Sequence, residues 1–228
     1  RGNTTTLGNE THVYDNANRH MATKSAAAQN VVLVVGTPGS LSNRDTWMRD
    51  RLQAAGWTVT IVDDDSMTSG SLTGKQLVAI SESVGGTGLT TTGTVLVSAA
   101  IPVVAAESFI YDELGMTGTG TNQGSTASQS SLNLTTAGAA HPLGADRAQG
   151  KVTTATSATM THGWGKPNTN AVVAATLTGD ATKATIFGYD TSATMVTGTA
   201  PARRVGFFYY GGNGATTFND NASKLFDA

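Results

Sequence analysis

Residues 31–45 read VVLVVGTPGSLSNRD, and this stretch decides the expected fold. The five apolar residues 31–35 predict a strand that is buried on both faces, because no polar residue alternates with them. A turn follows at 36–40, and Ser42 is a suitable N-cap for a helix that continues to Ala55. A buried strand, a tight turn and an amphipathic helix together indicate a parallel sheet that is covered by helices.

The pattern continues along the chain. Apolar or alternating runs predict strands at 57–62, 76–81 and 101–106, and a brief helix at 109–114. The polar stretch TGTGTNQGSTASQSS, residues 117–131, is expected to be a loop, since it offers little to a core. Shorter β-like pieces and a terminal helix follow it, at 131–135, 151–156, 171–177, 184–189, 205–210 and 221–227.

These elements predict an α/β fold with three layers and a mainly parallel, flavodoxin-like sheet, β-richer in its C-terminal half. Residues 31–228 are expected to form this single domain. Residues 1–30 carry no strong apolar period and are expected to form an extended arm.

Composition excludes several classes of function. Charged residues make up 13% of the chain and the formal net charge is −2, so the clustered basic surface that nucleic-acid binding needs is missing. No apolar run is long enough to predict a membrane span. Cysteine is absent, which excludes disulfides, thiolate metal sites and a cysteine nucleophile. Abundant Thr, Ala, Gly and Asn, with little Lys or Glu, is typical of secreted or cell-surface bacterial proteins.

Two features could hold an anion or a metal ion. The turn GTPGS at 36–40 matches no phosphate-binding motif, and Pro38 removes one backbone N–H, so an ordinary strand-to-helix turn is favoured. Asp63, Asp64 and Asp65 end a predicted strand and could bind Mg²⁺ or Ca²⁺. Successive residues of an extended chain point to opposite faces, however, which favours an exposed acidic turn. We expect no cofactor.

Catalytic candidates are scattered. Glu107 and Ser108 follow the predicted strand 101–106, the position of a nucleophile elbow, but the G-x-S-x-G pattern is missing. Pairing of Ser108 with His162, or of Glu107 with His141, would need distant segments to fold together. The alternative is that these side chains cap helices and turns, and it is the favoured one.

The segments VVLVVG, RLQAAGWTVTIVDDD, IPVVAAESFIYDELGMTG and APARRVGFFY, in this order, resemble a divergent class I glutamine amidotransferase-like domain. They are similar to the ThuA-like domains of secreted bacterial proteins, and the resemblance covers about residues 30–228. It implies the fold given above. The family's enzymes use a Cys at the elbow with a downstream His and Glu; here Glu107-Ser108 occupies that region, so the resemblance implies a scaffold without its catalyst.

Two functions follow as expectations. The first is a non-enzymatic extracellular structural protein, a subunit of a fibre or surface assembly. Copies of the chain would be joined by the arm through its β-favouring side chains Leu7, Val13 and Tyr14. The second is a carbohydrate-binding or degenerate hydrolase domain of a secreted polysaccharide-active protein. A removed signal peptide would explain a chain that begins at Arg1. Glycans are expected on N-x-[ST] sites, at Asn3, Asn9, Asn133 and Asn221.

Overall fold

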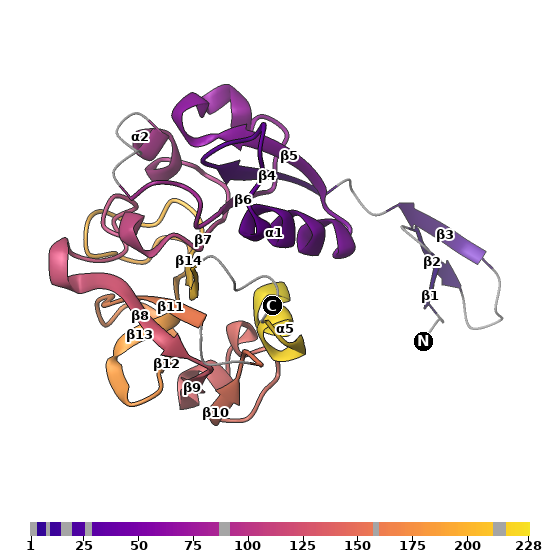
Figure 1. Ribbon diagram of the computed structural model, residues 1–228. Helices are drawn as coiled ribbons and strands as arrows, with labels where there is room; N and C mark the ends of the chain where they lie inside the picture. The colour runs from indigo at the N-terminus through magenta and orange to yellow at the C-terminus, as the bar shows by residue number, and fades with distance from the viewer. Residues whose placement is uncertain are drawn as a thin grey trace.

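The computed structural model of the protein describes residues 4–7, 10–14, 20–25, 29–86, 92–156, 160–211 and 218–228. These residues form two separate sheets. Strands β1 (Thr4–Leu7), β2 (Glu10–Tyr14) and β3 (His20–Ser25) form a small antiparallel sheet in the order β1-β2-β3, here called the N-terminal sheet. Figure 1 shows this sheet standing apart from the rest of the chain, here called the body.

The body is built on one 12-stranded sheet. One part of the sheet is parallel, in the order β5-β4-β6-β7-β14. Its strands are β4 (Asn30–Val35), β5 (Thr58–Asp63), β6 (Leu77–Ile80), β7 (Val103–Ala105) and β14 (Arg204–Phe207).

The remaining strands pair in antiparallel fashion. From β14 the sheet continues through β13 and β12 to β9 and β10, while β11 pairs with β13, β15 and β8 off this path. Their bounds are β8 (Gln123–Gln129), β9 (Ser131–Leu134), β10 (Gly150–Thr153), β11 (Met160–Gly165), β12 (Val172–Leu177), β13 (Asp180–Tyr189) and β15 (Tyr209–Tyr210).

The helices of the described residues are short. They are α1 (Asn43–Ala54), α2 (Thr92–Val97), α3 (Thr136–Ala139) and α5 (Asp220–Asp227). Single turns of 3₁₀-helix connect other elements, at η1 (Asp64–Ser66), η2 (Ser69–Leu72), η3 (Ser108–Ile110), η4 (Gly120–Asn122) and η5 (Pro142–Gly144).

Strand β4 separates two apolar cores. Val31, Leu33 and Val35 belong to the core that also contains Met48 and Leu52 of α1. The alternate residues of the strand, such as Val32, face a second core. Because side chains alternate along a strand, an unbroken apolar run is what a strand between two cores requires. The strand and helix predicted from residues 31–55 are confirmed, including Ser42 as the N-cap of α1.

The predicted fold class is wrong. The sheet is mixed, strand makes up 36% and helix 24%, and the four short helices of the described residues do not form two layers over a mainly parallel sheet. The parallel connections show why. The chain crosses from β5 to β6 through η1 and η2 rather than through a packed helix, and the segment between β7 and β14 is largely antiparallel sheet.

The predicted loop at 117–131 is also wrong. Residues Gln123–Gln129 form β8, which pairs with β11. Strand β11 itself was missed, because MTHGWG has two Gly and little apolar alternation. Trp164 of this strand is only 8% exposed, and its indole N–H donates to Thr126 Oγ1 at 3.0 Å. Backbone pairing with β8 orders both segments, which local composition did not indicate.

The expected extended arm is a paired structure instead. In β1 and β2, Thr4 lies opposite Val13 and Leu7 lies opposite Glu10, and β2 continues the pairing into β3 with Tyr14 opposite His20. The proposed arm residues Leu7, Val13 and Tyr14 therefore lie in strands that already have partners within the N-terminal sheet.

Candidate functional site

The carboxyl ends of β4, β6 and β7 meet at one edge of the parallel part of the sheet, the place where open α/β sheets usually bind ligands. A surface depression lies here. Its charged and aromatic lining consists of Arg44, Glu82, Glu107, Phe109 and Tyr210, here called the carboxyl-edge site. Arg44 lies in the first turn of α1, Glu82 and Glu107 follow the neighbouring strands β6 and β7, Phe109 lies in η3 and Tyr210 in β15.

An ion pair lies at the centre of the site. The Arg44 guanidinium pairs with Glu82, whose side chain is 5% exposed against 24% for that of Arg44. Glu82 Oε1 also accepts the Gly211 N–H at 3.3 Å. Glu82 therefore ties α1 to the segment that follows β15.

Glu107 has a different environment. It caps η3, since its Oε1 accepts the Phe109 N–H at 2.7 Å, and the residue is 4% exposed. Burial raises the pKa of Glu107 to about 7, although this hydrogen bond and the Arg44 charge lower it. Near neutral pH the Glu107 carboxyl group can therefore donate or accept a proton. Groups with this property are found in ligand-binding sites and act as general acids or bases in enzymes.

An aromatic surface adjoins the carboxylates. Phe109 is 40% exposed to solvent. In the described part of the chain, Val196 is the other large apolar side chain with such high exposure. The Phe109 ring centroid lies 5.7 Å from that of Tyr210, with the planes inclined at 60°. A Cβ on Gly86 would come within 2.7 Å of the Phe109 Cβ, so glycine is required for this loop to pack on the ring.

The turn at 36–40 lies behind this site and is held by hydrogen bonds of its own. The Gly36 N–H donates to Ser83 Oγ at 3.1 Å, and Ser83 Oγ donates to Asp45 Oδ1 at 2.5 Å. Asp45 Oδ2 accepts the N–H of Ser42 at 2.8 Å. The Gly36 N–H that a phosphate would need is thus already bonded within the chain.

The structure brings the segments of Ser108 and His162 together but does not form a catalytic pair. A Cβ on Gly163 would lie 3.1 Å from Ser108 Oγ, so this face of β11 meets Ser108. His162, one residue earlier, points to the opposite face. There its ring lies against Phe208 and its Nε2 is 3.4 Å from Thr154 Oγ1. Burial lowers the pKa of His162 to about 4, which keeps the ring neutral.

His141 and Glu107 lie in different surface depressions. His141 caps η5, with its Nδ1 accepting the Leu143 N–H at 3.2 Å. Both side chains thus perform the capping role that the sequence favoured.

The three carboxylates at 63–65 do converge, contrary to the expectation from an extended chain. Their ligand oxygens lie within 4.8 Å of one another. The strand ends at Asp63, whose Oδ1 accepts the Asp65 N–H at 3.0 Å, and the 3₁₀ turn η1 folds the three side chains to one side. Burial, and then the charges of Asp65 and Asp63, raise the pKa of Asp64. These three carboxylates can offer oxygen ligands to a hard cation. Acidic turns that hold no ion present the same ligands.

The two predicted glycosylation sites within the described residues lie in secondary-structure elements. Asn133 lies in β9 between β10 and β12, and Asn221 is in the first turn of α5, where its Nδ2 donates to the Thr153 carbonyl at 2.7 Å. Asn3 and Asn9 lie outside the described residues. Glycosylation at the four sites stays a prediction.

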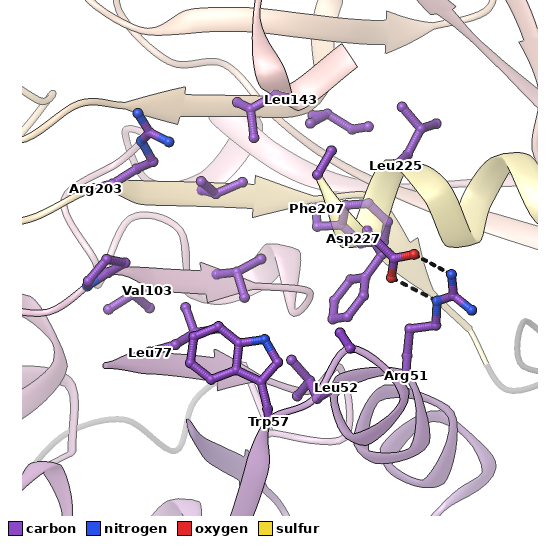
Figure 2. Close-up of a pocket in the computed structure, with 17 residues that line it drawn as sticks. Arg51, Leu52, Trp57, Leu77, Val103, Leu143, Arg203, Phe207, Leu225 and Asp227 are labelled. Atoms are coloured by element: carbon purple, nitrogen blue, oxygen red, sulfur yellow. Dashed lines mark hydrogen bonds and ion pairs between the residues drawn. The ribbon is translucent and has the colours of Figure 1, made fainter. Parts of the chain in front are cut away.

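A second depression lies on the other side of the molecule, between α1, α5 and the sheet. It is an apolar cavity of about 230 Å³ lined by residues that include Trp57, Leu77, Val103, Phe207 and Leu225. Figure 2 shows Arg51 of α1 reaching Asp227 of α5 at its border, where the Arg51 Nε donates to Asp227 Oδ1 at 2.8 Å. α1, the crossover helix between β4 and β5, and the terminal helix α5 both line this cavity.

Sequence reasoning missed Arg44, Glu82, Phe109 and Tyr210. One signal could have found the carboxylates: the pair Glu-Ser follows an apolar strand twice, at Glu82-Ser83 after β6 and at Glu107-Ser108 after β7. Since β6 and β7 are parallel neighbours, the two glutamates had to come to the same edge.

Comparison with known proteins adds no relative. No protein-family model matches the chain, and no curated protein matches its sequence. Within the residues described above, no helix has both the length and the apolar character needed to cross a bilayer.

Proposed function

We propose that the chain is a non-enzymatic structural subunit of an extracellular fibre or surface assembly, joined to its neighbours through the N-terminal sheet. One observation carries the proposal: β1, β2 and β3 pair with one another and with no described strand of the body. The chain thus holds a second, small sheet outside its main one.

A small sheet of this kind needs a partner. A sheet gains stability when one face is buried against another layer; a two-stranded hairpin alone is marginal in water, and three short strands need a hydrophobic face or a packing partner. A neighbouring copy would supply the missing contact, and repeated donation from one copy to the next would give an open fibre or a ring.

The proposal is tested by the association state of two chains, the full-length protein and a chain that lacks residues 1–29. We expect the full-length protein to form large species in sedimentation velocity and electron microscopy, and the shortened chain to be a folded monomer by the same methods and by circular dichroism. The same assembly without residues 1–29 would contradict the proposal.

The carboxyl-edge site favours a second function, the binding of a carbohydrate. A half-exposed aromatic ring beside two carboxyl groups and a guanidinium is the kind of surface on which a sugar ring can stack and hydrogen-bond its hydroxyls. Here no reaction is required: the ligand could anchor the assembly to a polysaccharide surface.

Titration of soluble polysaccharides against the full chain tests this second function. We expect Phe109→Ala to weaken binding at least about tenfold, the effect of losing one stacking contact of roughly 1.5 kcal/mol. Val196→Ala is the matched control, because Val196 is also exposed, at 42%, and does not line the site. Equal loss in both variants, or no binding by the wild type, would rule the function out.

A further inference from the structure

The 12-stranded sheet ends in strands that have a neighbour on one side only. Among the described strands, the two-residue β15 pairs with β11 alone. Of the longer strands, β5 pairs with β4 alone, β10 with β9 alone and β8 with β11 alone. An edge strand presents backbone N–H and C=O groups that another strand can pair with, unless charge, irregularity or short length prevents it. The three edges differ strongly in these protections.

Two of the edges are protected. Strand β10 has only four residues, begins at Gly150 with φ +126° and carries the exposed Lys151. Strand β8 is irregular: Ser128 has φ +59°, and its pairing with β11 shifts register between Met160 and His162. A partner strand would find no long, straight edge at either place.

Strand β5 is regular and unprotected. Its six residues, TVTIVD, pair with β4 in unbroken register from Thr58 to Asp63 and include no Pro, Gly or Lys. The Lys75 ammonium donates to Thr60 Oγ1 at 2.6 Å, and a side chain of the strand points to a face of the sheet rather than along its edge.

The hydrogen-bond pattern shows which groups of β5 are free. The Thr58 N–H donates to the Gln29 carbonyl on the β4 side at 2.7 Å. Backbone groups alternate in direction along a strand, so those of Val59 and Ile61 point away from β4. Their side chains pack against the core that contains α1, which fixes the strand in place. This edge offers two N–H and two C=O groups to a further strand.

The N-terminal sheet offers a strand that fits. Its border strands are β1 and β3. Strand β3 contains Lys24, whereas β1 reads TTTL, without charge, Gly or Pro and with three β-branched residues. The same chain therefore carries one unprotected edge in its body and one in its N-terminal sheet.

We infer that the free edge of β5 accepts β1 of a second copy of the chain, joining the N-terminal sheet of one copy to the 12-stranded sheet of the next. This rests on the proposed assembly function and names its acceptor surface. Backbone hydrogen bonds supply the affinity, and the contact is heterologous because the donor and the acceptor strands differ.

Full-length Val59→Pro tests the acceptor. Proline removes an N–H that points away from β4, a position where edge strands tolerate it, so pairing with β4 is kept. Val59→Ala is the control, since it shortens the same side chain and keeps the N–H. We expect the proline variant to raise the concentration needed for half-assembly at least about tenfold and the alanine variant to assemble near the wild-type concentration.

Disulfide trapping tests whether β1 is the donor strand. The chain has no cysteine of its own, so any disulfide must form between the introduced residues. Two full-length proteins are mixed and oxidised, one with Thr6→Cys in β1 and one with Thr58→Cys in β5; Thr5→Cys samples the other face of β1. Paired strands lie close enough for a disulfide, whose Cα atoms are about 4.4–6.8 Å apart. We expect mixed disulfide dimers with Thr58→Cys and not with the control Lys151→Cys on β10.

The outcomes separate the two proposals. Assembly that needs residues 1–29 but is unaffected by Val59→Pro, with equal trapping at positions 58 and 151, would overturn the β5 acceptor and leave the assembly function standing. A wild-type chain that stays monomeric at every concentration would overturn both.

Discussion

Glu107 and His162 are buried ionisable side chains. The hydrogen bonds given for them above join each to an uncharged group, the Phe109 N–H and the Thr154 hydroxyl. Burial raises the pKa of Glu107 to about 7 and lowers that of His162 to about 4. Both shifts have the same cause, since a low-dielectric interior disfavours the charged form of either group. Their effects on stability, however, have opposite signs.

For Glu107 the folded state binds a proton more tightly than the unfolded state, whose carboxyl group titrates near pH 4.5. The free energy of unfolding therefore falls as pH rises from about 4.5 to about 7, and no further above that. For His162 the free energy of unfolding falls as pH drops from about 6.5 to about 4, because in this range the imidazole takes up a proton in the unfolded state and not in the folded state. In the wild type the two slopes oppose each other between pH 4.5 and 6.5.

Glu107→Gln should isolate the first effect. The amide oxygen can still accept the Phe109 N–H and has no charge to bury. We expect the variant to match the wild type near pH 4.5 and to exceed it above pH 7 by on the order of 3 kcal/mol. Urea denaturation across this pH range measures the difference, and a constant difference at all pH values would show that Glu107 is not buried as described.

At the scale of elements, one side chain secures the end of α2. Arg204, at the start of β14, is fully buried, and the four N–H groups of its Nη1 and Nη2 are shared among six carbonyl oxygens within 3.3 Å. Those of Leu96 and Val97 lie in the last turn of α2, and that of Ala99 lies just beyond it. The guanidinium thus supplies hydrogen bonds that helical carbonyls at a C-terminus lack and joins α2 to the parallel sheet.

Arg204→Met should therefore destabilise the protein severely. Methionine fills much of the volume but leaves buried carbonyls without donors, and we expect a loss of about 3–5 kcal/mol in the free energy of unfolding. The neighbouring Arg203→Met is the control: Arg203 forms an exposed ion pair with Asp190 and should contribute less than about 1 kcal/mol. Thermal melts of the two variants compare them directly, and similar melting temperatures would contradict the role of Arg204.

At the scale of the whole molecule, the two sheets should differ in stability. Strand β4 lies between two cores of the 12-stranded sheet, whereas β1–β3 form a separate three-stranded sheet. Local stability follows buried apolar contacts. In dilute, monomeric protein we expect amide hydrogens of β1–β3 to exchange at least about 100-fold faster than those of β4, since about 2.7 kcal/mol corresponds to that ratio.

Concentrated, assembled protein should show protection of β1–β3 close to that of the body if the N-terminal sheet binds a neighbour. Hydrogen exchange followed by mass spectrometry at the two concentrations gives the comparison. Unchanged exchange in β1–β3 on assembly would place the joint elsewhere.

Residues 31–55 show what the sequence by itself determined. The apolar run of β4, the cap at Ser42 and the helix α1 depend on neighbours close in the chain, so their pattern is visible in sequence. The same holds for the terminal helix and for the positions of Glu107 and His141, which cap the turns beside them.

The tertiary structure alone decided the rest, because the deciding contacts join residues far apart in the chain. Strands β8 and β11 exist through their mutual pairing, although neither has a strong strand pattern. Gly163 lets β11 approach Ser108 while His162 turns away, so proximity in space did not create a catalytic pair. The carboxyl-edge site likewise needed the register of β6 beside β7 to bring Glu82 and Glu107 to one edge, since parallel strands align their ends only after the sheet has formed.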